Sequence, residues 1–218
     1  MKTKRVVACL VIMAVLAIAA MLFACGGSQH LYVSSSSLNS VATFSLTANG
    51  NVTPAATIIG ANTGLNSPGL IALDSSGKIY VPNGNTNSVT VYAAGASGNA
   101  TPTATIIGAN TGLSGPNGLA LDSSGKIYVT NAIANSVTVY AAGASGNATP
   151  TAAIIGANTG LSAPIGIALD ASGKIYVANN SANSVTVYAA GASGNVAPLA
   201  TISGANTGIG TALGVAVY

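Results

Sequence analysis

The chain has 218 residues, half of them hydrophobic and only 4% charged, with 27 Gly, 2 Cys, 1 His and no Trp. So much hydrophobicity with so little charge argues against a disordered chain, and the glycine content is far below that of collagen. The net charge of +3 comes from Lys2, Lys4 and Arg5, because the later three Lys and three Asp cancel. Nucleic acid is therefore not an expected partner, since binding phosphates requires clustered cations.

Residues 1–24 have the pattern of a targeting signal, with a basic head followed by an apolar run over 6–24. The run ends in Leu-Phe-Ala-Cys and is followed by Gly-Gly-Ser, which resembles the lipobox of bacterial lipoproteins. This resemblance implies removal of 1–24, acylation of Cys25 as a membrane anchor and a flexible tether over 25–29. It predicts an exported protein on the bacterial cell envelope, at the outer membrane where the cell has one. An uncleaved membrane span is the alternative.

A repeat occupies the rest of the chain. The segment Leu-Asp-Ser-Ser-Gly-Lys-Ile-Tyr-Val at 73–81 recurs 48 residues later at 121–129 and, with Ala in place of one Ser, at 169–177. A degenerate first copy occupies 30–44. Near-identical copies at one period indicate a repeat architecture.

Each period predicts four short strands, which in the third copy fall at 118–122, 126–130, 136–141 and 152–155. Their β-branched and aromatic content and their Gly, Asn and Pro boundaries favour strands over helices. Asp-Ser-Ser-Gly-Lys predicts a tight hairpin turn, because Asp caps its own turn and Gly accepts positive φ. Four antiparallel strands per repeat predict an all-β fold, a β-propeller.

The run Pro-x-Gly-x-Ala-Leu-Asp-x-Ser-Gly-Lys-Ile-Tyr-Val-x-Asn resembles the NHL-repeat propeller family, and the resemblance covers nearly all of 30–218. We place the repeats at about 30–66, 67–114, 115–162 and 163–210. The first lacks an innermost strand, and 211–218 has the pattern of one. We expect this last strand to close a ring of about four blades. An open fragment of a longer ring and two chains sharing one eight-bladed ring are the alternatives.

The repeats differ mainly in the loops between their second and third strands, and where the innermost strands begin. Loops on a rigid scaffold often bind ligands, and neutral amides suit a glycan or a protein backbone. Free drift of ordinary turn residues after duplication is the alternative. The candidate binding rim consists of Asn83, Asn85, Asn87, Asn117, Asn131, Asn135, Asn179, Asn180 and Asn183.

Catalytic chemistry finds little support in the sequence. His30 is the only histidine and is expected to be an exposed strand residue. Asp74, Asp122 and Asp170 each stand alone in a blade and predict turn caps with weak ion pairs to the Lys four residues later. We therefore expect no catalytic residue, no metal and no cofactor. The predicted function is a non-catalytic, membrane-anchored binding or scaffolding propeller with a protein or glycan partner. The alternatives are a propeller lactonase or lyase acting on a small molecule in the central channel, and a purely structural envelope protein.

Overall fold

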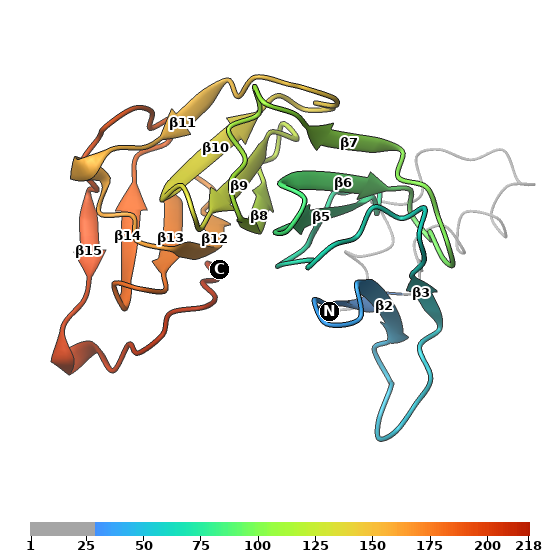
Figure 1. Ribbon diagram of the computed structural model, residues 1–218. Coiled ribbons are helices and arrows are strands. Elements are labelled where there is room, and N and C mark those ends of the chain that lie inside the picture. The colour runs from blue at the N-terminus through green and yellow to red at the C-terminus, as the bar shows by residue number, and fades with distance from the viewer. Residues whose placement is uncertain (1–28) are drawn as a thin grey trace, which may run out of the picture.

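The computed structural model describes residues 29–218, which form four antiparallel sheets arranged around a common centre (Figure 1). The first sheet contains β1 (His30–Ser35), β2 (Ser40–Ser45) and β3 (Ala56–Ile58). The second contains β4 (Ala72–Leu73), β5 (Ile79–Asn83), β6 (Ser88–Tyr92) and β7 (Ala104–Ile107). The third contains β8 (Pro116–Leu121), β9 (Ile127–Asn131), β10 (Ser136–Tyr140) and β11 (Ala152–Ile154). The fourth contains β12 (Pro164–Leu169), β13 (Ile175–Asn179), β14 (Ser184–Tyr188) and β15 (Ala200–Ile202). Two short 3-10 helices, η2 (Ala157–Thr159) and η3 (Ala205–Thr207), lie in loops.

This arrangement confirms the predicted all-β propeller of antiparallel blades, with strand bounds within two residues of those expected for the third repeat. The hairpin turn is also confirmed, because the Asp122 N–H donates to the Lys126 carbonyl at 3.2 Å and Gly125 adopts a φ of 81°. In the second blade the innermost strand is only two residues long. There the Leu70 N–H donates at 2.7 Å to the Asn117 carbonyl of the third blade. The backbone that leads into β4 is therefore hydrogen-bonded to the next blade.

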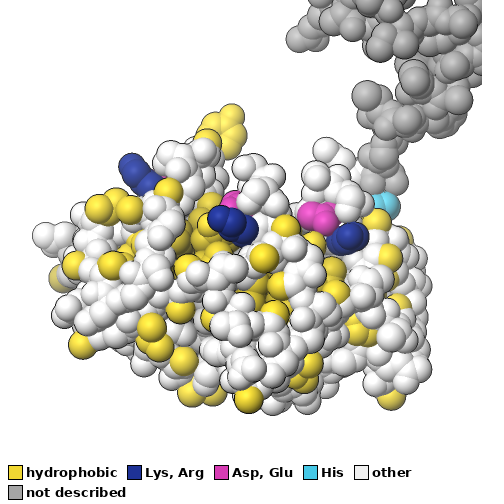
Figure 2. Space-filling view, turned by 90° about the horizontal axis from the view of Figure 1, so that it is seen from above, with side chains coloured by type: hydrophobic (Ala, Val, Ile, Leu, Met, Phe, Trp, Pro, Cys, Tyr) yellow, Lys and Arg dark blue, Asp and Glu magenta, His cyan; other side chains and the backbone are white. Residues whose placement is uncertain are grey.

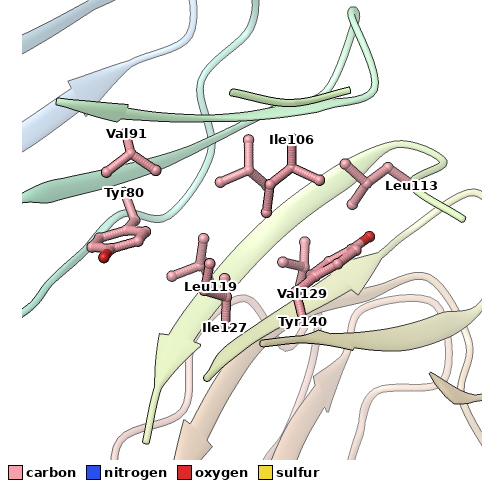
Figure 3. Close-up of a cluster of buried hydrophobic side chains, with 9 residues drawn as sticks. Tyr80, Val91, Ile106, Leu113, Leu119, Ile127, Val129 and Tyr140 are labelled. Carbon is pink, nitrogen blue, oxygen red and sulfur yellow. The ribbon is translucent and has the colours of Figure 1, made fainter. Parts of the chain in front are cut away.

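The core consists of three separate clusters between adjacent blades. Figure 3 shows the middle one, in which Tyr80 and Ile106 of the second blade face Leu119, Ile127 and Tyr140 of the third. Equivalent clusters join the first blade to the second and the third to the fourth. Most central members are fully buried, so each joint removes a continuous apolar surface from water. Five of the repeated tyrosines pack in these clusters between blades: Tyr80, Tyr92, Tyr128, Tyr140 and Tyr188.

The buried tyrosines should make the fold less stable as the pH rises through the alkaline range. Burial raises the pKa of Tyr140 to about 12, and its hydroxyl donates to the Thr111 carbonyl at 2.6 Å. The folded pKa lies above the usual value of about 10, so the protonated form is stabilised by folding. This contribution is complete below pH 10 and is lost between pH 10 and about 12. We expect the free energy of unfolding, measured in urea, to fall steeply over this interval and less steeply in Tyr140→Phe. Equal slopes would contradict the assignment.

The expected closure of the ring by 211–218 is not observed. No strand is assigned within 203–218, and β1 pairs only with β2. The last residues instead lie against β12, where a Cβ on Gly166 would be 2.7 Å from the Leu213 oxygen. Their backbone therefore lies beside the innermost strand of the fourth blade, just as β8 and β12 lie beside the innermost backbone of the blade before them. Figure 1 shows a gap between this last segment and the first blade.

Candidate functional site

The two ends of the blades carry different chemistry. We call the end with the turns 74–78, 122–126 and 170–174 the Asp rim, and the end with the loops between second and third strands the loop rim. In the part of the chain that the structure describes, these three turns contain every Asp and Lys. Figure 2 shows Lys and Asp side chains together along one edge of the molecule. All ionised side chains from residue 29 onward therefore lie on the Asp rim.

Each Asp holds its turn through one carboxylate oxygen. Asp122 Oδ1 accepts from the Ser124 N–H at 2.9 Å, the Ser124 hydroxyl at 2.7 Å and the Lys126 N–H at 2.9 Å. Its Oδ2 has a single, long contact, from the Tyr128 hydroxyl at 3.4 Å. Burial opposes ionisation, but the hydrogen bonds outweigh it and lower the pKa of Asp122. The same bonds recur at Asp74 and Asp170, whose pKa values are also lowered. The second, third and fourth blades thus each present an ionised carboxylate, one oxygen of which has a single, long hydrogen bond.

Two of these carboxylates share a groove. A cavity of about 420 Å³ opens between the second and third blades and is lined by Leu73, Asp74 and Ser75 on one side. Leu121, Asp122, Ser123 and Gly125 line the other side. Because these residues end or directly follow the innermost strands β4 and β8, the groove lies at the mouth of the central region around which the four sheets are arranged. Asp170 does not line it. A second cavity of about 380 Å³ lies between the same blades, beside Lys78, Tyr80 and Ala144.

The expected Asp–Lys ion pairs do not form. Among residues 29–218 no Lys nitrogen lies within 4 Å of a carboxylate, and each Lys instead meets its Asp through the backbone N–H. The carboxylate is turned toward the tight hairpin, which leaves the long Lys side chain exposed. The same residues contain no group of three His, Cys, Asp or Glu suited to a metal ion. The donor set of the described residues therefore does not fit a carboxylate or histidine metal cluster.

On the loop rim, three of the candidate asparagines are buried. Asn131 donates to the Val129 carbonyl at 3.3 Å and to the Thr138 hydroxyl at 3.1 Å, and accepts from the Ser114 N–H at 3.1 Å. Asn83 and Asn179 make the matching bonds in their blades. All three are fully buried, and their amides bind the incoming crossover to the blade. Sequence reasoning missed this role, because the crossover partner lies 17 residues away in the chain.

Three further candidates connect neighbouring blades. Asn135 has a φ of 50° and accepts from the Ala163 N–H of the next blade at 2.7 Å. Asn87 does the same toward Gly115 of the third blade, and Asn183 accepts from the Thr211 N–H at the start of the terminal segment 211–218. A left-handed turn is a conformation that Asn tolerates, so the residue type serves both the turn and the joint. We call these residues, with the equivalent Asn39, the clasp asparagines.

The remaining loop-rim candidates have little or nothing to bind them within the chain. Asn85 donates to Asn66 at 3.2 Å on the exposed surface. Asn180 reaches the Ala212 carbonyl at 3.5 Å. Asn117 uses its backbone carbonyl for the bond to Leu70, and its half-buried side chain has no hydrogen bond in the described region. Binding of a ligand at the loop rim stays a prediction.

A protein-family model matches the middle part of the chain. Residues 95–197 match the SMP-30/gluconolactonase/LRE-like region, a β-propeller family related to NHL. This range contains the turns of Asp122 and Asp170 and the complete third blade. None of the curated proteins compared with the sequence matches it significantly.

Solved structures with similar folds are propellers. A streptogramin B lyase has a TM-score of 0.54 at 15% identity, over 76% of this chain and 53% of its own. Inactive virginiamycin B lyase from Staphylococcus aureus, solved with quinupristin, has a TM-score of 0.54 at 13% identity, over 75% and 50%. The WD40 β-propeller domain of Doa1 has a TM-score of 0.55 at 12% identity, over 84% and 53%. The chain spans about half the length of these proteins, and at such identity the likeness shows the fold alone.

The prediction that the chain is not an enzyme is wrong in the light of the family match, which points to an enzymatic propeller. That prediction treated each carboxylate as isolated in its blade, whereas the groove brings Asp74 and Asp122 together from adjacent blades. Cys25 and the predicted signal lie outside the described residues. From residue 29 onward there is no helix of the length and apolarity that a membrane crossing needs. The chain is a β-propeller protein whose residues 95–197 match the SMP-30/gluconolactonase/LRE-like region.

Proposed function

We propose that the chain is a propeller enzyme of the lactonase or lyase class that acts on a small polar molecule in the groove between Asp74 and Asp122. The observation that supports this most is the gluconolactonase-like match over 95–197, which includes the Asp122 turn. The groove adds a matching geometry, since it is open to solvent at the mouth of the central region and combines two carboxylates with apolar Leu73 and Leu121. A ligand with hydroxyl groups suits carboxylate acceptors.

In a lactonase reaction the carboxylate of Asp122 or Asp74 would act as the general base. It would take a proton from a water molecule as that water attacks the ester carbonyl. It would then return the proton to the alkoxide that leaves when the C–O bond breaks. The Oδ2 atom is available for this role, because the turn occupies Oδ1. Since the pKa of Asp122 is lowered, the base stays ionised in mildly acidic solution. Activity should therefore persist to a lower pH than with a carboxylate base of ordinary pKa.

Asparagine substitutions test this proposal with a control inside the same molecule. Asp122→Asn and Asp74→Asn keep an oxygen that caps the turn but remove the base, so hydrolysis should fall about 100-fold. Asp170→Asn makes the same change in the equivalent turn of the fourth blade, outside the groove, and should retain activity. The assay would follow proton release from gluconolactone and linearisation of a streptogramin B, with folding of each variant checked by thermal unfolding.

An equal loss in all three variants would assign the carboxylates to the turns alone. Unchanged hydrolysis in Asp122→Asn and Asp74→Asn would remove them from the mechanism, and no turnover of either compound class by the unmodified protein would overturn the proposed function. We further propose that the enzyme works outside the cytoplasm, attached to the cell envelope by acylated Cys25. The lipobox-like residues before Cys25 support this location.

A further inference from the structure

We propose that two copies of this chain form one closed propeller, in which the last strand segment of each copy completes the first blade of the other. The proposal depends on the joints between blades and not on the catalytic groove. Three joints within the chain have the same construction, and the two outer blades each carry one half of a fourth. The residues expected at the interface between two copies are therefore equivalent to residues that already pack together in the three joints within one chain.

Each joint packs one face of a blade onto the opposite face of the next. Between the second and third blades, Tyr80 and Ile106 contribute one face, and Leu119, Ile127 and Val129 contribute the other. The residues 48 positions later form the joint between the third and fourth blades. The joint between the first and second blades follows the same scheme. We call the face that a blade turns toward the next blade in the chain its leading face, and the face toward the preceding blade its trailing face. The residues of the two faces are complementary and repeat from joint to joint.

The first blade has an uncovered trailing face. Leu31 is 51% exposed and Val33 is 43% exposed. Their equivalents in the other three blades are all 0% exposed: Ile79, Ile127 and Ile175 for Leu31, and Val81, Val129 and Val177 for Val33. Apolar side chains that are buried in every complete joint thus lie in solvent here.

The fourth blade has the uncovered leading face that would match it. Ile202 is 49% exposed, whereas its equivalents Ile58, Ile106 and Ile154 are at most 1% exposed. Leu199 nearby is 63% exposed. The two free faces of one chain are the two halves of a single standard joint, and they do not meet within the chain.

The segment 211–218 carries the sequence of the strand that the first sheet lacks. Gly214-Val215-Ala216-Val217 corresponds to Gly118-Leu119-Ala120-Leu121 of β8, 96 residues earlier. In the third blade Leu119 pairs with Val129. Moving the first strand of this pair 96 residues forward, to 215, and the second 96 residues back, to 33, places Val215 opposite Val33 of β1. Addition of this strand would also cover the unpaired edge of β1, and exposed edges are sites of chain association.

A second copy fits these faces better than an unrelated partner would. It supplies both the leading face and the missing strand, in the register already used three times. Residues 29–218 contain three Lys and three Asp, so no net charge opposes the approach of two copies. The solved propellers are about twice as long as the matched part of this chain, since 53% of the streptogramin B lyase is covered. Two copies would give eight blades, within the usual range of about 4–8.

Disulfide trapping tests the proposal. We would introduce Val33→Cys and Val215→Cys separately into the full chain carrying Cys9→Ser and Cys25→Ser, each with a different tag, in mild detergent. Ladder bonding alternates from the Asp122–Lys126 hydrogen bond, which puts Leu119 and Val129 in a non-hydrogen-bonded pair. Cα atoms in such pairs are about 4.5 Å apart, within disulfide reach. Mixing the two variants should yield a reducible heterodimer carrying both tags. Leu38 is 67% exposed on the loop rim, and a Leu38→Cys variant should form no heterodimer with either of them.

A second measurement separates the outcomes. The mass from analytical ultracentrifugation should be that of a dimer, and Leu31→Asp or Ile202→Asp should convert it to a monomer with unchanged circular dichroism. If a Val33→Cys/Val215→Cys double variant forms its disulfide within one chain, four blades close alone and the proposal is overturned. A monomer without any disulfide overturns it as well, and so does a dimer that yields no heterodisulfide. None of these readouts depends on enzymatic activity.

Discussion

Replacing Gly118 by Ala should abolish cooperative folding of the third and fourth blades or reduce the free energy of unfolding by about 3 to 5 kcal/mol. A Cβ at this position would overlap the carbonyl oxygen of Ile165 in the next innermost strand and would lie 3.0 Å from the Thr130 hydroxyl. That hydroxyl accepts from the Gly118 N–H at 2.8 Å and donates to Ile165 at 2.8 Å. The backbones of two innermost strands and the Thr130 side chain therefore meet where only hydrogen fits, and backbone cannot give way as a flexible side chain can.

Gly210→Ala is the matched control for this prediction. A Cβ added to Gly210 would have no atom within 4 Å, and the residue has no positive φ, so the change should alter stability by less than about 1 kcal/mol. Urea unfolding followed by far-UV circular dichroism measures both variants. A Gly118→Ala protein as stable as Gly210→Ala would show that the innermost strands do not approach each other so closely.

Replacing Asn131 by Ala should destabilise the fold by about 2 to 4 kcal/mol. The buried amide makes three hydrogen bonds, and its loss would leave the Ser114 N–H and the Val129 carbonyl without that partner. A buried polar group without a partner costs far more than the average bond contributes. The effect should appear as a lower midpoint in urea unfolding.

Asn85→Ala provides the comparison on the same rim. Asn85 is exposed, and its amide makes a single 3.2 Å bond to Asn66, so we expect a change below about 0.5 kcal/mol. If both variants lost the same stability, the buried amide of Asn131 would not be the cause. If neither lost any, the bonds from its amide to the crossover would contribute nothing net.

Much of the fold follows from short-range patterns. The turn at Asp122 could be predicted because Asp, Ser, Gly and Lys stand within five residues and bond to one another. The four strands per repeat could be predicted for the same reason, since each hairpin is local. The joints between blades could be anticipated only in outline, because the sequence shows that Tyr140 is aromatic and repeated but not that its hydroxyl reaches the Thr111 carbonyl.

The candidate site depended on contacts that sequence patterns do not reveal. Asn131 and Asn85 look alike in the sequence, yet one is fully buried and the other exposed. The groove was missed because its two carboxylates are 48 residues apart and belong to different blades. Closure could not be decided from the repeat phase, because 211–218 has the same pattern whether it pairs with its own β1 or with that of another copy.

The clasp asparagines have a consequence for how this protein changes over evolutionary time. Each clasp asparagine accepts a hydrogen bond from a backbone N–H 28 residues later, where the next blade or, after the fourth blade, the terminal segment begins. Any unit of 48 residues can therefore be excised or copied without changing the parts that meet at the new junction. In repeat proteins stability is the sum of units and nearest-neighbour contacts. Recombination between the near-identical copies would accordingly lengthen or shorten the protein by whole blades. The number of blades would vary, whereas the packing at each joint would stay the same.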